Sequence, residues 1–163
     1  MNFFQYRIFG YTISYIVERF GGTLLFIITM CLCLFWLKPT YPTFKELIKE
    51  FPTLGMCAFG FLLTFLGIIL QGNSDTINWF RSRTTLYERF IRSNKNIVVM
   101  SLTLSLYCYI IGYLDFQINH KYMNRFIEIF ELIGVSLFIS LSIKFIFDFW
   151  TFIKVFYLLI KKD

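Results

Sequence analysis

The stretch LIGVSLFISLSIKFIFDFW, Leu132–Trp150, decides the fold class of this chain. As a helix it is long enough to cross the ~30 Å hydrocarbon core of a membrane, which takes ~20 predominantly apolar residues. A helix is the expected conformation because it satisfies its own backbone hydrogen bonds in lipid. The stretch therefore predicts a transmembrane helix, and the two charges inside it, Lys144 and Asp148, need an explanation.

The composition of the whole chain also indicates a membrane protein. Of its 163 residues 57% are hydrophobic and 21% aromatic, and the mean hydropathy is +0.63. Soluble domains average ~45–50% apolar residues. We therefore expect an all-α integral membrane protein with four transmembrane helices in a single domain over residues 1–163. The expected spans are residues 20–37, 53–71, 96–114 and 132–150.

The distribution of basic residues predicts the orientation. Eleven of the 16 Lys and Arg residues precede the first span, lie in the loop of residues 72–95, or lie from Lys144 onward. Cytoplasmic segments carry an excess of Lys and Arg. Both termini and the 72–95 loop are thus expected to be cytoplasmic. Because topology accounts for the net charge of +6, we expect no direct nucleic-acid binding.

Two loops have the pattern of short amphipathic interfacial helices. In the first loop, Phe44, Leu47, Ile48 and Phe51 form one apolar stripe, which predicts a short helix covering the outer rim, with a ligand site as the alternative. The 72–95 loop combines an apolar face with a basic one. Its arginines are Arg81, Arg83, Arg89 and Arg92. They are expected to contact lipid phosphates or a cytoplasmic partner protein or anionic ligand, and both alternatives stay open.

Small residues predict where helices approach each other. The second span carries Gly60, Thr64 and Gly67, and the third carries Ser101, Ser105 and Gly112. Stripes of small residues let membrane helices pack closely. These two spans are therefore expected to pack against each other or against a neighbouring copy of the chain.

Polar residues recur along the fourth span every four residues. They are Ser136, Ser140, Lys144 and Asp148. Lys144 and Asp148 are spaced to pair along the helix, so one interpretation is a self-neutralised pair near the cytoplasmic interface. Ionisable side chains at membrane depth normally face a bundle interior or a water-filled path. The other interpretation is therefore a polar path or gate lined by this stripe, in a homo-oligomer of fourth spans.

The sequence contains no pattern of an intramembrane enzyme. HExxH, GxSxG, an intramembrane aspartate pair and a glycine-rich phosphate loop are all missing from it. Such chemistry needs a nucleophile with a base, paired carboxylates or a metal site. We therefore expect a non-enzymatic protein with no catalytic residues, cofactor or metal.

The segment GFLLTFLGIILQGNSDTINWFRSRTTLYERFIRS, residues Gly60–Ser93, resembles the second span and following loop of small membrane proteins of bacterial anti-phage defence systems. Kiwa KwaA-like proteins and Hailong-type membrane effectors are the types it is similar to, through hydropathy and a Gly/Ser/Tyr/Arg pattern. The resemblance carries over no ligand or catalytic motif.

The resemblance implies an oligomeric subunit in the bacterial inner membrane. Such a subunit would work with a cytoplasmic partner, either sensing infection or perturbing the membrane. A housekeeping transporter or ion channel, and a membrane anchor for a soluble complex, remain the alternatives.

Overall fold

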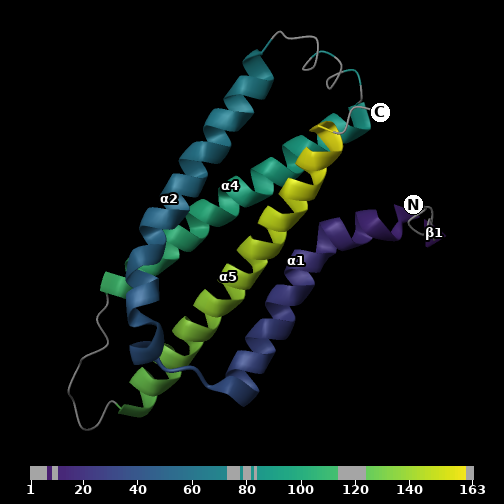
Figure 1. The fold of residues 1–163 in the computed structure, drawn as a ribbon. Coiled ribbons are helices and arrows are strands. Elements are labelled where there is room, and N and C mark those ends of the chain that lie inside the picture. Colours follow the sequence, from purple (N-terminus) through teal and green to yellow (C-terminus); the bar gives the residue numbers. More distant parts are fainter. Residues whose placement is uncertain are drawn as a thin grey trace.

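The computed structural model describes residues 7–8, 11–72, 78, 82, 84–113 and 124–160. In this part of the chain a small strand pair precedes four long helices (Figure 1). The elements are β1 (Arg7–Ile8), β2 (Tyr11–Thr12), α1 (Ile13–Leu32) with its π-helical continuation η1 (Cys33–Leu37), α2 (Tyr41–Gln71), α4 (Thr84–Tyr113) and α5 (Asn124–Ile160). The two strands are antiparallel and pair Arg7 with Thr12.

Each long helix contains a segment that is long and apolar enough to cross a membrane. These segments are Arg19–Leu37, Tyr41–Ile69, Tyr87–Tyr113 and Ile127–Lys154. The four expected spans fall on these four helices, so the expected all-α, four-helix membrane architecture is confirmed.

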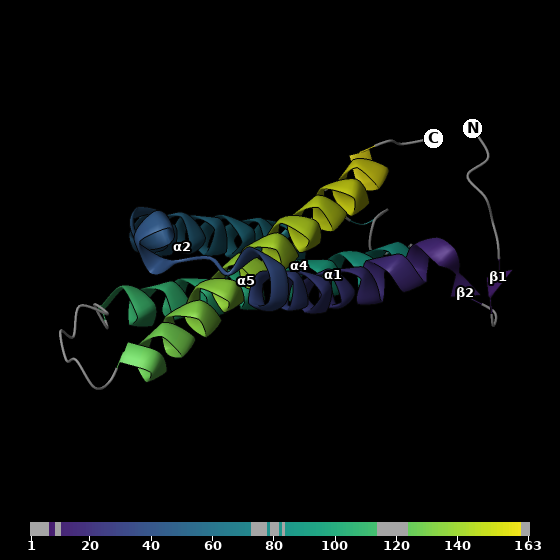
Figure 2. The ribbon, with the colours of Figure 1, turned by 90° about the horizontal axis from the view of Figure 1, so that it is seen from below.

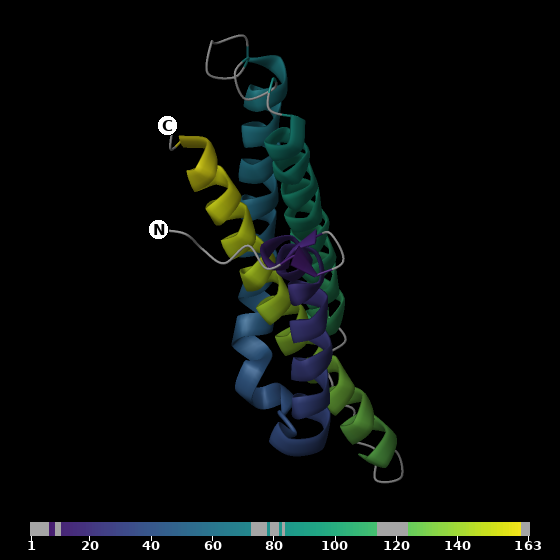
Figure 3. The ribbon, with the colours of Figure 1, turned by 90° about the vertical axis from the view of Figure 1, so that its right-hand side faces the viewer.

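Helix α5 lies at the centre of the arrangement. It packs against α1 on one side and against α4 on the other, while α2 packs mainly against α4 (Figure 1). Figures 2 and 3 show α5 running obliquely across α2 and α4. Helix α1 lies at the edge, and large side chains such as Phe20, Leu24 and Ile27 are exposed on it. In a membrane this exposed face suits contact with lipid.

The buried core joins α2, α4 and α5 in two hydrophobic clusters. One contains Tyr41, Ile48, Leu104, Cys108, Ile111, Val135 and Phe138. The other contains Leu62, Ile69, Phe90, Ile97 and Phe152. Edge-to-face contacts between phenylalanine rings, such as Phe51 with Phe138, connect the helices. Because lipid tails are as apolar as these side chains, close packing holds the helices together.

The segment between the first two expected spans, residues 38–52, differs from its expected form. The segment predicted as a separate interfacial helix forms the first turns of α2, which begins at Tyr41 and continues through Pro52. Its apolar stripe packs on α5, because Phe44 and Phe51 both contact the ring of Phe138. The Glu131 carboxylate of α5 also accepts a hydrogen bond from the backbone N–H of Tyr41, at 2.5 Å. These contacts with α5 attach the segment to the bundle and make it part of a span.

The loop expected over residues 72–95 is shorter than predicted. Residues 84–95, predicted as part of the loop, belong to α4, which extends to Tyr113 without interruption. The buried Phe90 explains this, because its ring packs against Phe65 of α2 and Phe152 of α5. Arg81 and Arg83 lie outside the described residues.

Candidate functional site

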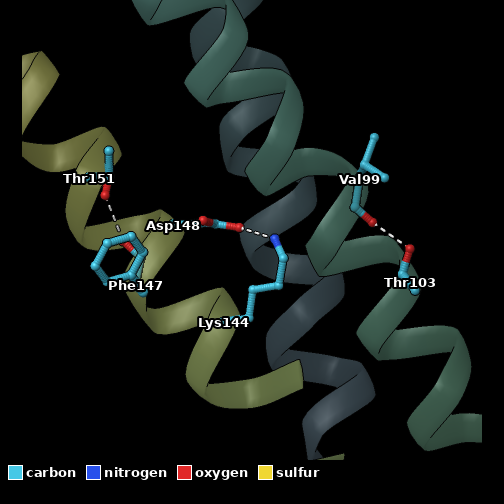
Figure 4. Close-up of polar contacts among 6 residues, drawn as sticks. All are labelled: Val99, Thr103, Lys144, Phe147, Asp148 and Thr151. Atoms are coloured by element: carbon cyan, nitrogen blue, oxygen red, sulfur yellow. Dashed lines mark hydrogen bonds and ion pairs between the residues drawn. The ribbon is translucent and has the colours of Figure 1, made fainter. Parts of the chain in front are cut away.

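The charged residues of the fourth span form an ion pair. The Nζ atom of Lys144 donates to Oδ2 of Asp148 at 2.7 Å, and the two side chains are 20% and 12% exposed. Figure 4 shows both side chains extending from α5 toward each other, on the side facing α4. The predicted pairing one helical turn apart is confirmed, and it neutralises two charges that the apolar surroundings cannot solvate.

The pair lines a hollow of about 360 Å³ between three helices. We call it the α1–α4–α5 hollow. Its lining residues are Arg19, Gly22 and Thr23 of α1, Lys95, Asn96, Val99 and Met100 of α4, and Lys144 and Asp148 of α5. The lining thus combines three cationic side chains with one carboxylate. The hollow is an open groove on the bundle, and its described lining has an excess of positive charge.

Two adjacent glycines allow α1 to approach α5 at this point. A Cβ atom at Gly22 would lie 2.6 Å from Oδ1 of Asp148, and one at Gly21 would lie 2.7 Å from the ring of Phe147. Real Cβ atoms do not approach other atoms this closely. Glycine at position 22 therefore leaves room for the Asp148 carboxylate, and glycine at position 21 leaves room for the Phe147 ring. Our sequence reasoning missed these residues, although a Gly-Gly pair inside an apolar span is itself a signal of close helix approach.

The two serines of the polar stripe are fully buried. Ser136 and Ser140 are both 0% exposed, and the Ser140 hydroxyl contacts Sδ of Met30 on α1 at 3.7 Å. Ser140 also donates to the backbone oxygen of Ser136 at 2.7 Å, while the hydroxyl of Ser136 has no hydrogen-bond partner in the described part of the chain. Ser140 and Asp148 of the stripe therefore face α1 within one chain. A path along it needs no second copy of α5, and oligomerisation around the stripe stays a prediction.

The basic residues of the predicted cytoplasmic loop do not line this hollow. Arg89 is half-buried and Arg92 is exposed, both on α4 and each with an interaction partner. The hollow takes its α4 cation from Lys95, one turn further along the helix. Lys95 and Arg19 were not among our candidate site residues. Sequence spacing within one helix gives no sign that the two share a space.

The small-residue stripes have different surroundings on the two helices. Ser101 and Ser105 are buried on α4, and a Cβ at Gly55 of α2 would lie 2.0 Å from Oγ of Ser105. A Cβ atom at Gly112 would lie 3.8 Å from Cγ of Lys49 on α2. The stripe on α4 thus faces α2, with Gly55 as the closest small residue.

The stripe predicted for the second span lies on the other side of α2. A Cβ at Gly60 or Gly67 would have no neighbouring atom within 4 Å, and the exposed Thr64 hydroxyl donates to the backbone oxygen of Gly60 at 2.9 Å. The second and third spans pack against each other as expected, but α2 uses the face of Gly55 and not the Gly60–Gly67 stripe. Packing against a neighbouring copy remains open.

The described residues show no candidate metal site. They contain no group of three or more His, Cys, Asp or Glu side chains that could hold a metal ion. The four cysteines are free thiols. Asp115 and His120 lie outside the described residues.

These features define the chain as a multi-pass α-helical membrane protein with a charged hollow among its spans. No family model, curated protein or solved structure matches it.

Proposed function

We propose that the chain is a non-enzymatic subunit of a bacterial anti-phage defence system that changes the permeability of the inner membrane during infection. The observation that carries this proposal is the Lys144–Asp148 pair at the edge of a polar hollow between three membrane helices. The resemblance of residues Gly60–Ser93 to membrane proteins of defence systems supports the biological setting.

The energetic cost of the charges supports a functional role for the pair. A charged side chain at the centre of a membrane helix costs about 2.5–3.5 kcal/mol on insertion scales. Mutual pairing lowers this cost, but an apolar pair of similar size would avoid it altogether. Intramembrane ionisable residues therefore mark ion or proton pathways by default. We infer that Lys144 and Asp148 line the inner part of such a pathway.

We infer that the proposed pathway is closed in this conformation. From the hollow, the polar stripe continues to Ser140 and Ser136, which are both fully buried, and Ser140 contacts Met30 of α1. Helix α1 packs chiefly against α5 and has few other contacts in the bundle. Movement of α1 away from α5 would expose the stripe without disturbing the core between α2, α4 and α5. Helix α1 is therefore the moving element of the proposed gate.

The proposed assembly is a homo-oligomer that works with a cytoplasmic partner or signalling ligand. The outward-facing stripe of Gly60, Thr64 and Gly67 on α2 suits close packing against a second copy in the membrane. The exposed Arg92 near the beginning of α4 suits an acidic partner or anionic lipid. Arg89 of the same helix and Arg81 and Arg83, which lie outside the described residues, are the other arginines proposed for this contact.

The proposed orientation places both termini in the cytoplasm, together with the segment between α2 and α4. Reporter fusions test it. A fusion after Gly72 at the end of α2 and one after Asp163 should both read cytoplasmic, and a fusion after Lys38 should read periplasmic. The reverse pattern at any of the three positions would contradict the orientation.

The infected cell provides the test of the proposed function. A phage-sensitive bacterium carrying the chain with its neighbouring genes should lose membrane potential during infection and restrict phage growth. Uninfected cells should keep their potential. A voltage-sensitive dye read in single cells measures this directly. Depolarisation without phage would favour a housekeeping channel, and an unchanged potential with intact protection would favour an anchor for a soluble complex.

A further inference from the structure

The α1–α4–α5 hollow contains two cations that the ion pair does not neutralise. Lys144 is bound to Asp148, whereas Arg19 and Lys95 line the same hollow without an acidic partner among the described residues. Arg19 instead lies over the ring of Phe20, with Cζ 5.4 Å from the ring centroid. The described lining residues therefore carry a formal net charge of two positive units. Such a space attracts an anion.

Two neutral donors lie beside these cations. Thr23 of α1 and Asn96 of α4 also line the hollow. Neither side chain has a hydrogen bond within the described part of the chain. Hydroxyl and side-chain amide groups can donate hydrogen bonds to phosphate oxygens. Val99 and Met100 make the rest of the α4 side apolar, and Figure 4 shows Val99 on α4 across from the ion pair. The hollow thus offers a polar end and an apolar wall.

The location and size of the hollow narrow the class of anion. Arg19 begins its span, Lys95 lies in the first half of its span, and Lys144 lies in the second half of its span. All three positions are at the end that the basic residues assign to the cytoplasm, where anionic lipid headgroups lie. The volume of about 360 Å³ is at the small end of the range of ~300–1,000 Å³ for ligand pockets. It suits a single phosphate-bearing headgroup better than a large ligand.

We propose that the hollow binds a phosphate group, held by Arg19 and Lys95 and hydrogen-bonded by Thr23 and Asn96. Arg and Lys are the residues that bind phosphate most effectively in proteins. The group belongs to an anionic phospholipid or to a phosphate-bearing solute. A phosphate bound there competes with Asp148 for the ammonium of Lys144, and this consequence for gating rests on the proposed function.

Binding is measured on the full chain in nanodiscs, with two probes that separate the sources. Native mass spectrometry compares retention of phosphatidylglycerol with that of phosphatidylcholine. Calorimetric titration with inorganic phosphate in phosphatidylcholine nanodiscs tests the soluble source. The variant Arg19→Gln/Lys95→Gln should lose affinity by about tenfold to a hundredfold, since each cation near the surface contributes about a fivefold factor or more. Lys154→Gln, the same change at an exposed lysine of α5 outside the hollow, should bind like the unmodified chain.

The outcomes are distinct. Selective retention of phosphatidylglycerol identifies a lipid headgroup, and binding of inorganic phosphate alone identifies a solute; either supports the site if the double variant loses it. Equal binding by the unmodified chain and the double variant, for both probes, would overturn it. Should the double variant not fold, the single changes Arg19→Gln and Lys95→Gln apply the same criterion. Binding is independent of conduction, so a failure to depolarise infected cells would leave this result intact.

Discussion

Replacement of Gly55 by leucine is expected to destabilise the helix bundle strongly. A Cβ atom at this position would lie 2.0 Å from Oγ of Ser105 and 3.3 Å from the backbone oxygen of Ser101. Rotation of the serine side chain relieves only the first contact, and leucine adds three more carbons. Helices α2 and α4 would have to separate, and α2 packs mainly against α4. Overpacking of a core costs about 1–3 kcal/mol and occasionally more, and we expect the upper end here.

The matched control is Gly60→Leu on the same helix. A side chain there meets no atom within 4 Å, so this variant should fold like the unmodified chain. The measurement is the temperature at which half of the detergent-solubilised protein leaves its monodisperse peak in size-exclusion chromatography. Equal stability of Gly55→Leu and Gly60→Leu would contradict the packing described above. If Gly60→Leu folds but loses a larger assembly, the α2 stripe is a contact between copies.

The second large effect concerns the ion pair. Removal of one partner from a buried pair costs about 3–5 kcal/mol, and somewhat less for a pair as exposed as Lys144 and Asp148. The two single variants should differ in how much stability they lose. Asp148→Leu leaves three cations in one hollow without a carboxylate, whereas Lys144→Met leaves the carboxylate with Arg19 and Lys95 nearby. Asp148→Leu should therefore be the more destabilising change.

The double variant Lys144→Met/Asp148→Leu separates charge from packing. Both replacements fill similar volume and leave neither Lys144 nor Asp148 as a charge without its partner, so the protein should regain most of its stability. The same thermal assay measures all three variants. Additive losses in the double variant, instead of recovery, would show that the two residues do not stabilise each other.

The sequence was sufficient to predict the spans and the ion pair. Apolar length alone defines a transmembrane helix, and the spacing of Lys144 and Asp148 is a property of one helix. The boundaries of α2 and α4 could not be predicted in this way. They extend further because Ile48 and Phe90 find partners on other helices, and tertiary packing of this kind leaves no mark on local hydropathy.

The hollow is also a property of the assembled helices. Arg19, Lys95 and Lys144 come from three spans and meet only because α5 lies between α1 and α4. The periodicity of α5 identified its polar stripe but not the element that covers it. The Gly21–Gly22 pair carried that information, since adjacent glycines in a span allow another helix to approach. The stripe on α2 was misleading for a similar reason, because Gly55 and Gly60 lie on different faces of one helix.

The central claim is that Lys144 and Asp148 line a gated path through the membrane and are not merely a pair neutralised near its surface. The most direct measurement is the membrane potential of infected cells carrying Lys144→Met/Asp148→Leu, at a membrane level and assembly state equal to those of the unmodified chain. The account predicts that these cells keep their potential and lose protection against phage. Full depolarisation and full protection by this assembled variant would contradict it.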